Sequence, residues 1–301
     1  MWPTTQTDIW QAGIVHAPIG RVLAAGSLAD FAITWLPAQP DFCFLADPFG
    51  LWRGGQLHVF VEAYDYRDKH GVIRRYSYDR DFKLTDDGVA LRAAHHLSYP
   101  YLIEDAGQVF MLPEAHHSGK LTLYKARDFP DVWEKVCDVL DAPAIDASVI
   151  RHDSKWWMFY ALPGSDQRDM RELHAASAPA LTGPWQLHPM NPLRVSMDSA
   201  RPGGTPFIES GTLYIPTQDC TSTYGGAVNV LRVDELSDSA FRCTSGRKFS
   251  PASITTSFTD GLHTLSACGE VTLIDVKRFE RSPRRILINW QRRWRRLAGR
   301  A

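Results

Sequence analysis

The 301-residue sequence has no long apolar run and few cysteines. No stretch approaches the roughly 18 apolar residues that a transmembrane helix needs. The first residues also lack a basic segment followed by an apolar one, so we expect no signal peptide. The five cysteines are scattered and form no CxxC pair, which is typical of buried thiols and not of a disulfide framework or a zinc site. These features predict a cytoplasmic protein.

Motifs that would identify several enzyme classes are also missing. The sequence has no GxxxxGK[ST] loop or GxGxxG turn for nucleotides, and no GxSxG elbow for a serine hydrolase. The paired histidines His95-His96 and His116-His117 have no neighbouring cysteine or carboxylate at the spacing of a structural zinc site. We therefore expect no cofactor and no bound metal.

The net charge of −1 conceals a strong asymmetry along the chain. Residues 277–301 carry one lysine and nine arginines against a single acid, Glu280, so the rest of the chain is acidic. Such a split indicates an anionic partner for the basic tail, either lipid headgroups or nucleic acid.

A short pattern recurs five times along the chain. Each copy is a short strand, a tight turn with Gly or Asp, and a second strand rich in β-branched and aromatic residues, which is the signature of a hairpin. The anchor residues of the copies are Pro48, Pro100, Ala147, Pro202 and Gly261. Their spacing of about 47 to 59 residues, with further short strands in each period, is typical of a propeller blade.

These repeats predict an all-β protein, a five-bladed β-propeller over residues 1–278. Residues 279–301 form the basic amphipathic C-terminal tail. No stretch before residue 277 shows a sustained helical period of apolar residues. An irregular β-sandwich is the alternative.

The first strand of every propeller blade lines the central axis, so the starts of the five copies should converge there. These starts contribute Asp47, Tyr99, Asp146, Arg201, Asp260 and His263. The ends of the second strands contribute Glu62, Glu114, Gln218 and Asp219. Carboxylates accept hydrogen bonds from sugar hydroxyls, and paired acids can perform acid–base catalysis, so this set suits a carbohydrate.

Structural roles are open for the same residues. Asp47 and Asp146 are also typical of turns that set the entry to a blade. Glu62 and Glu114 occupy equivalent positions in successive copies, where they could hydrogen-bond an edge strand. His263 is less easily explained as a structural residue, because it falls where the axis should be.

Several motifs carry a resemblance to a known family. They are the segments 44–49, 62–66, 199–204, 218–220, 224–226 and 260–265, which include Tyr224 beside two glycines. In this order they resemble the N-terminal domain of plant glucosamine inositolphosphorylceramide transferases and their bacterial relatives. That group is distantly similar to five-bladed glycoside hydrolases of families 43 and 32. The resemblance implies a carbohydrate-related role, although sugar transfer in the plant proteins is attributed to a separate domain.

The sequence departs from the hydrolases at one position. The resemblance matches Asp47 to their base or nucleophile in the first blade, and Asp146 to their second acid. Where they carry a glutamic acid in the fourth blade, this chain has Arg201-Pro202. Glycoside hydrolysis needs a proton donor for the leaving oxygen, and Glu62, Glu114 or His263 would have to supply it. An arginine suits an anionic group such as a sugar phosphate.

The tail is expected to form a helix over 284–298, following Pro283. Its apolar residues Ile286, Trp290, Trp294 and Leu297 share one face, and arginines crowd the flanks. This pattern is typical of a helix lying in the headgroup plane of an anionic membrane, with contacts through Arg284–Arg300. Two alternatives are a helix that closes the propeller and a nucleic-acid contact, which the acidic body would oppose.

The leading hypothesis is a carbohydrate-active enzyme on the inner membrane face, favouring glycosyl transfer in surface polysaccharide assembly. Asp47 would act as base or nucleophile and Asp146 would orient it, while Glu114 or His263 would donate the proton. Arg201 would bind an anion. The residues expected to bind substrate beside it are Glu62, Tyr99, Gln218, Asp219, Tyr224 and Asp260. A glycosidase and a non-catalytic glycan-binding module are the alternatives.

Overall fold

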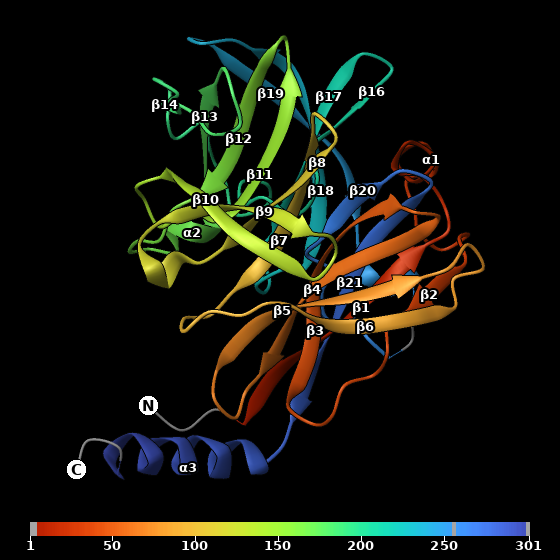
Figure 1. Cartoon of the computed structure of the whole chain (residues 1–301), viewed down its shortest axis with the longest axis vertical. Coiled ribbons are helices and arrows are strands. Elements are labelled where there is room, and N and C mark those ends of the chain that lie inside the picture. The colour runs from red at the N-terminus through yellow and green to blue at the C-terminus, as the bar shows by residue number, and fades with distance from the viewer. Residues whose placement is uncertain (1–4, 255–256, 299–301) are drawn as a thin grey trace.

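The computed structural model describes residues 5–254 and 257–298, and the side chains at 253 and 293–298 are not described. It consists of five antiparallel sheets arranged in a ring, so the predicted five-bladed β-propeller is confirmed (Figure 1). Each predicted anchor residue lies in or directly before the innermost strand of a blade. The alternation of apolar residues with tight turns therefore located every blade.

Blades I and II follow each other along the chain, and each runs outward from the axis. Blade I contains β3 (Cys43–Arg53), β4 (Gln56–Asp65), β5 (His70–Tyr78) and β6 (Leu84–Leu91). Blade II contains β7 (Ser98–Asp105), β8 (Gln108–Glu114), β9 (Leu121–Asp128) and β10 (Val132–Leu140).

Blades III and IV continue the ring. Blade III contains β11 (Ile145–His152), β12 (Lys155–Ala161), β13 (Glu172–Ala178), β14 (Gln186–Leu187) and β15 (Arg194–Val195), the last two both pairing with β13. Blade IV contains β16 (Phe207–Glu209), β17 (Thr212–Asp219), β18 (Ala227–Leu236) and β19 (Phe241–Phe249).

Blade V joins the two ends of the chain. Its strands are β20 (Leu265–Cys268), β21 (Val271–Arg281), β1 (Gln6–Val15) and β2 (Ile33–Trp35). The antiparallel register of β1 on β21 runs from Gln6 opposite Arg281 to Val15 opposite Thr272. Because one sheet contains both early and late strands, the ring is closed by main-chain hydrogen bonds. β21 continues three residues past the expected domain boundary at residue 278.

Apolar side chains fill the spaces between neighbouring blades. Ala12 and Ile14 of β1, for example, pack in one buried cluster with Leu45, Leu57 and Val59 of blade I. Each sheet buries both faces in this way, because a propeller blade is covered by a neighbour on either side.

The helices are few and short. They are α1 (Ile19–Ala25), α2 (Arg168–Arg171), α3 (Arg284–Ala298) and the 3-10 turns His116–Ser118 and Pro251–Ser253. The predicted helix over 284–298 is confirmed at both ends. Within the described ranges, none of these helices has the length and apolar character needed to cross a bilayer. In Figure 1, α3 lies across one end of the molecule, beyond the end of β21.

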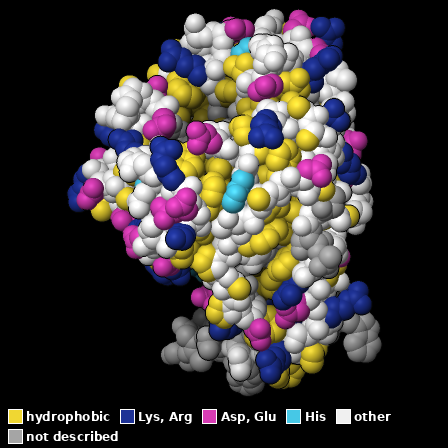
Figure 2. Space-filling view, turned by 90° about the vertical axis from the view of Figure 1, so that its right-hand side faces the viewer, with side chains coloured by type: hydrophobic (Ala, Val, Ile, Leu, Met, Phe, Trp, Pro, Cys, Tyr) yellow, Lys and Arg dark blue, Asp and Glu magenta, His cyan; other side chains and the backbone are white. Residues whose placement is uncertain are grey.

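The acidic excess of the body is not gathered on the flank shown in Figure 2. Lysine and arginine side chains are interspersed there with aspartate and glutamate, with hydrophobic side chains between them. This flank therefore presents no large field of one sign.

The closure of the ring by β1 predicts a large effect of a small substitution. Ile14 is fully buried between blades V and I. Ile14→Ala should therefore lower the free energy of unfolding by about 3 kcal/mol, measured by chemical denaturation. The matched control is Ile208→Ala on β16, where the side chain is 46% exposed, and it should change stability by less than about 0.5 kcal/mol. Equal effects at the two positions would contradict the closure argument.

Candidate active site

Three inner strands share an irregularity that turns one side chain toward the axis. Each of the strands β3, β7 and β11 pairs with the second strand of its own blade, and the register of each pair shifts partway along the strand. At each shift one residue has a positive φ: Asp47 at 51°, Tyr99 at 44° and Asp146 at 50°. A bulge re-aims its side chain and is common beside active sites. The positions are equivalent in blades I, II and III, so the repeat has produced three similar side-chain placements.

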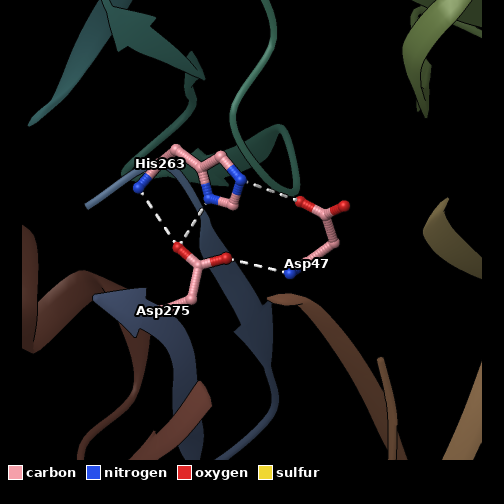
Figure 3. A group of neighbouring side chains, drawn as sticks. All are labelled: Asp47, His263 and Asp275. Carbon is pink, nitrogen blue, oxygen red and sulfur yellow. Dashed lines mark hydrogen bonds and ion pairs between the residues drawn. The ribbon is translucent and has the colours of Figure 1, made fainter. Parts of the chain in front are cut away.

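Asp275 of β21 organises the axial end of blades I and V (Figure 3). Its fully buried carboxylate accepts hydrogen bonds from the backbone N–H groups of Asp47 (2.9 Å), His263 (3.1 Å) and Thr264 (3.0 Å). It also bonds Nδ1 of His263 at 2.8 Å. The other ring nitrogen, Nε2, lies 3.5 Å from Oδ1 of Asp47. Asp275 thereby fixes both the backbone of Asp47 and the ring of His263.

The imidazole of His263 is also held by aromatic rings. Trp10 of β1 stacks on it, with ring centroids 3.7 Å apart and planes 13° from parallel. Tyr224 meets the same imidazole edge-on at 5.5 Å. His263 is thus buried and in contact on several sides, with Nε2 facing Asp47. That it donates a proton stays a prediction.

Four carboxyl groups gather next to this arrangement, and we name them the axial carboxylate cluster: Asp47, Glu62, Glu114 and Asp146. All four are buried, and the charge of each affects the pKa of others in the group. Glu62 and Glu114 close the second strands of blades I and II, as the repeat predicted. The cluster therefore joins three successive blades.

The surroundings shift the pKa values of these four carboxyl groups by different amounts and in different directions. Burial raises the pKa of Asp47 to about 6, and the neighbouring carboxylates add to the rise while His263 opposes it. Burial also raises the pKa of Glu62 well above its ordinary value, with Asp47 and Glu114 contributing. Its neighbour His96, with Nε2 3.4 Å from Oε1 of Glu62, has a pKa lowered to about 4 by burial. These surroundings favour the protonated form of Glu62.

Glu114 behaves in the opposite way. Burial alone would raise its pKa, but the hydrogen bond from His116 at 2.5 Å and the charge of Arg201 lower it to about 2. It shares a further hydrogen bond with Asp146. Burial raises the pKa of Asp146 well above its ordinary value, despite Arg201. Glu114 is thus ionised near pH 7 and is a poor candidate for the general acid.

Arg201 is already neutralised by carboxylates of the chain. Its Nε donates to Asp146 at 2.7 Å and its Nη1 donates to Asp169 of α2 at 3.1 Å. The guanidinium also lies over the ring of Tyr224 at 5.1 Å. Both of these contacts engage the guanidinium within the chain. That Arg201 binds an anionic ligand stays a prediction.

Several predicted binding residues lie beneath or outside the cluster. Tyr99 is fully buried, and its hydroxyl contacts Ser148 and the backbone of Gly204. Gly204 has a φ of +137°, and a Cβ there would meet the backbone oxygen of Leu265 at 2.0 Å, so this junction requires glycine. Gln218 is also fully buried and donates to Asp146 at 2.9 Å.

Asp219 and Asp260 have structural partners instead. Asp219 bonds Lys248 at 2.6 Å and caps the turn at Thr221. The carboxylate of Asp260 accepts the backbone N–H of Phe279 at 2.7 Å. Asp219 is thus held by its own turn and by β19, and Asp260 by β21.

Sequence reasoning missed several residues of the site. They are Trp10, His96, His116, Asp169 and Asp275. Asp275 follows the strand of the fifth copy, so its position in the repeat was a usable signal. No pattern in the sequence pointed to Asp169, because it reaches Arg201 only through the packing of α2 on blade III.

One group of side chains has the composition of a metal site. Atoms of Asp47, His263 and Asp275 lie within 4.8 Å of one another. The carboxylate of Asp275, however, already accepts four N–H donors, as described above, and His263 Nδ1 is one of them. A cation would have only Asp47 and one histidine nitrogen left to bind, so these residues fit a metal poorly.

The axial carboxylate cluster is almost closed to solvent. One hollow of about 290 Å³ lies at the far ends of the inner strands, lined by Trp52, Glu104 and Gly269 among others. A larger groove of about 540 Å³ lies between blades III and IV, beside His152 and Arg232. Neither hollow is lined by a residue of the axial carboxylate cluster.

Comparison with known proteins adds to this geometry. Residues 6–249 match the model of the family described as glucosamine inositolphosphorylceramide transferase 1, N-terminal. Glucosamine inositolphosphorylceramide transferase 1 of Arabidopsis thaliana is 32% identical over 246 residues, which are 80% of this chain and 31% of the relative. The chain thus spans about three tenths of the relative's length. The family resemblance drawn from the motifs is confirmed.

Solved structures of low sequence identity share the fold. The catalytic domain of a family 62 α-L-arabinofuranosidase from Coprinopsis cinerea has a TM-score of 0.58 at 9% identity, covering 80% of this chain and 93% of that one. A thermostable family 43 glycoside hydrolase has a TM-score of 0.53 at 16% identity, covering 72% and 83%. These likenesses support the propeller architecture of the glycoside hydrolases and, with the family match, a carbohydrate-related role.

The raised pKa of Asp47 predicts a pH-dependent stability. The carboxyl has an ordinary pKa of 3.8 and a folded value of about 6. Between these values the folded protein binds more protons than the unfolded chain, so this carboxyl makes the wild type less stable as the pH rises. Asp47→Asn removes the effect, so relative to wild type it should gain about 3 kcal/mol between about pH 4 and pH 7.

Denaturant titrations of both proteins across this pH range would measure the difference. Asp81→Asn in an exposed turn is the matched control and should give a difference that does not change with pH. A flat difference for Asp47→Asn would show that the Asp47 carboxyl is not perturbed by its surroundings.

Proposed function

The chain belongs to the glucosamine inositolphosphorylceramide transferase 1 N-terminal family, and from that membership we propose that it is a carbohydrate-active enzyme. Its reaction is glycosyl transfer in the assembly of a glycan or glycolipid precursor for surface polysaccharide. The observation that carries the proposal is the axial carboxylate cluster, in which buried acids of one site differ widely in pKa. Enzymes that act on glycosidic bonds use two carboxyl groups with different pKa values, so that one acts as an acid and the other as a base at the same pH.

Two carboxyls of blade I have the protonation that the reaction needs. Glu62, whose raised pKa favours the protonated form, donates its proton to the oxygen of the leaving group as the glycosidic bond breaks. Asp47, ionised above about pH 6, accepts the proton of the incoming hydroxyl as its oxygen bonds to the anomeric carbon. One proton leaves Glu62 and one arrives at Asp47, so the step is balanced. Glu62 thus replaces Glu114 and His263 as the proposed proton donor.

The surrounding residues hold these two acids in place. Asp275 and His263 fix Asp47, while the pair of Asp146 with Arg201 stands beside Glu114. Tyr224, half-buried at the edge of this group, contacts Arg201, Lys277 and His263 through its ring. These contacts pre-organise the acids before substrate arrives, which reduces the reorganisation that catalysis requires.

Hydrolysis is the second candidate, because the same acid pair can act on water as well as on an acceptor hydroxyl. The observation that supports hydrolysis is the same pair of buried carboxyl groups, Glu62 and Asp47. A non-catalytic glycan-binding module is the alternative in which the cluster only holds hydroxyl groups.

We also propose that the enzyme works at an anionic membrane surface, with the cytoplasmic face as the expected side. Leu287 and Trp290 of α3 are 62% and 63% exposed. The helix contacts the propeller through its other side, where Arg285 and Arg292 meet Tyr66. Of the residues on the predicted apolar face, Trp290 is exposed and Ile286 is half-buried, while the side chains of Trp294 and Leu297 lie outside the described residues. The exposed Trp290 favours a membrane-facing helix over one that closes the propeller. An exposed Leu–Trp face flanked by arginines suits the headgroup layer.

Substitution of the proposed acid tests the catalytic proposal. Glu62→Gln keeps the shape of the side chain but cannot give up a proton, so the turnover rate should fall by about 10² to 10⁴-fold. The measurement is product formation from a panel of glycosyl donors with and without acceptors. Glu104→Gln, exposed at the far end of the axis, is the control and should retain full activity.

The products separate the three functions. A new glycoside that requires an acceptor supports transfer, and free sugar released in water supports hydrolysis. Saturable binding of a sugar with no product for any donor would contradict the enzymatic proposal and favour the binding module.

The outward face of α3 predicts membrane binding. The double variant Leu287→Ser/Trp290→Ser should bind vesicles of phosphatidylcholine and phosphatidylglycerol about tenfold more weakly than wild type, measured by co-sedimentation. Leu187→Ser, which alters a 62% exposed leucine on β14, is the control and should bind like wild type. Equal binding by all three proteins would rule out this face as the membrane contact.

A further inference from the structure

Arg285 is a buried arginine whose charge has no partner. Its side chain is near the start of α3, and the residue is only 5% exposed. The Nε and Nη1 atoms are buried without a hydrogen-bond acceptor. Among the residues that the structure describes, no carboxylate lies within 4 Å of its guanidinium.

The other buried arginines show what is missing. Arg75 bonds Asp86 at 2.8 Å and Asp131 at 2.7 Å, and Arg201 bonds two carboxylates as described above. A buried guanidinium is costly unless it is paired and hydrogen-bonded. Arg75 and Arg201 satisfy this rule, and Arg285 departs from it. Its two unused donors therefore indicate an anionic partner from outside the chain.

The surroundings of Arg285 form a seam between α3 and the end of β4. The guanidinium carbon lies 4.1 Å from the ring centroid of Tyr66, and Nη1 of Arg292 donates to the backbone oxygen of Tyr66 at 3.3 Å. Burial raises the pKa of Tyr64 to about 12, and the positive charges of both arginines act to lower it. Both charges therefore lie near this seam. No acid occupies the first turn of α3.

The seam lies next to the proposed general acid. Tyr66 meets Tyr64 at 4.9 Å between ring centroids, and Tyr64 meets His96 at 5.6 Å. His96 in turn contacts Glu62. The rings of Tyr66, Tyr64 and His96 therefore stand between a ligand held by Arg285 and the axial carboxylate cluster.

We propose that this seam binds a phosphoryl group through Arg285, with Arg292 adding charge. This inference rests on the proposed function, for which it supplies the anionic part of the substrate site. A phosphoryl group fits because the forked guanidinium donors match its oxygens and because two positive charges suit a group of charge near −2. The carboxylates of the cluster repel an anion, so the phosphoryl group stays on α3 while an attached sugar points toward Glu62.

The group can be a lipid headgroup or the phosphate of a soluble ligand, since both present the same oxygens. The two unpaired donors are covered in this structure, so binding requires the Arg285 side chain to turn outward or α3 to shift. Such a movement would cost Arg285 its contact with the Tyr66 ring but no ion pair with a described carboxylate. Binding of the anion thus supplies the missing acceptor.

The test compares neighbouring arginines on the same helix. Arg285→Met and Arg284→Met remove the same charge, but Arg284 is 73% exposed and pairs at the surface with Asp41. In the full-length protein, inorganic pyrophosphate should raise the melting temperature of wild type and Arg284→Met and leave that of Arg285→Met unchanged. Without ligand, Arg285→Met should melt no lower than wild type, because the variant loses no ion pair.

A second variant and a vesicle assay extend the comparison. Arg285→Lys keeps the charge without the forked donors and should bind pyrophosphate at least about tenfold more weakly than wild type. Vesicles of phosphatidylcholine with phosphatidic acid should bind Arg285→Met more weakly than Arg284→Met if the source is a lipid. A response to pyrophosphate without this vesicle difference identifies a soluble phosphate as the source.

Two results separate this inference from the catalytic proposal. Equal responses of wild type, Arg284→Met and Arg285→Met to both probes would overturn the phosphoryl site. Glu62→Gln should bind pyrophosphate like wild type, because it leaves the seam intact. If Glu62→Gln were fully active while Arg285→Met had lost binding, the catalytic assignment would fail and the site would stand.

Discussion

The carboxylate of Asp275 is the contact on which the site depends. It comes from β21, near the end of the chain, and it accepts the backbone N–H of Asp47 from blade I and those of His263 and Thr264 from blade V. A buried acceptor with this many donors is costly to replace, because each donor left without a partner carries its own desolvation penalty. The positive φ of Asp47 and the orientation of the His263 ring are both stabilised by this one group.

The rest of the axial region follows from the problem of burying several acids together. Like charges this close cannot all ionise, so the protein distributes cations unequally among them. Arg201 stands by Asp146 and His116 stands by Glu114, whereas Glu62 has only a neutral histidine. The unequal pairing leaves the pKa of Glu62 raised and that of Glu114 lowered within the same site. Two residues that the repeat places in equivalent positions thus differ in pKa.

The sequence predicted the fold well because the evidence for a blade is local. The turn and the alternating strands of a hairpin are both visible within a few residues of sequence, so the five anchors identified five sheets. In the same way Pro283 indicated the start of α3. The same repeat also located Asp47, Glu62, Glu114 and Asp146 near the axis.

The partners of these residues could not be predicted in the same way. The sequence suggested that Arg201 binds an anion, because it did not reveal that Asp169 pairs with this arginine. Asp169 lies on a separate helix and meets Arg201 only after blades III and IV have packed. The apolar face of α3 was visible in the sequence, but the side facing the propeller was not, since that depends on how Arg285 meets Tyr66. Residues such as Asp219 and Asp260 occupied suitable repeat positions, yet their local turns claimed their carboxylates.

The closure of blade V also has a consequence for synthesis of the protein. β1 is synthesised before blades I to IV and its partner β21 after them, so β1 must wait for all four blades before it can pair. Blades I to IV consist of strands adjacent in sequence and can form earlier, because local contacts close shorter loops. Asp275 arrives with β21, so an unfinished chain lacks the carboxylate that orients Asp47 and His263. The chemistry of the site is therefore withheld from nascent chains until the ring has closed.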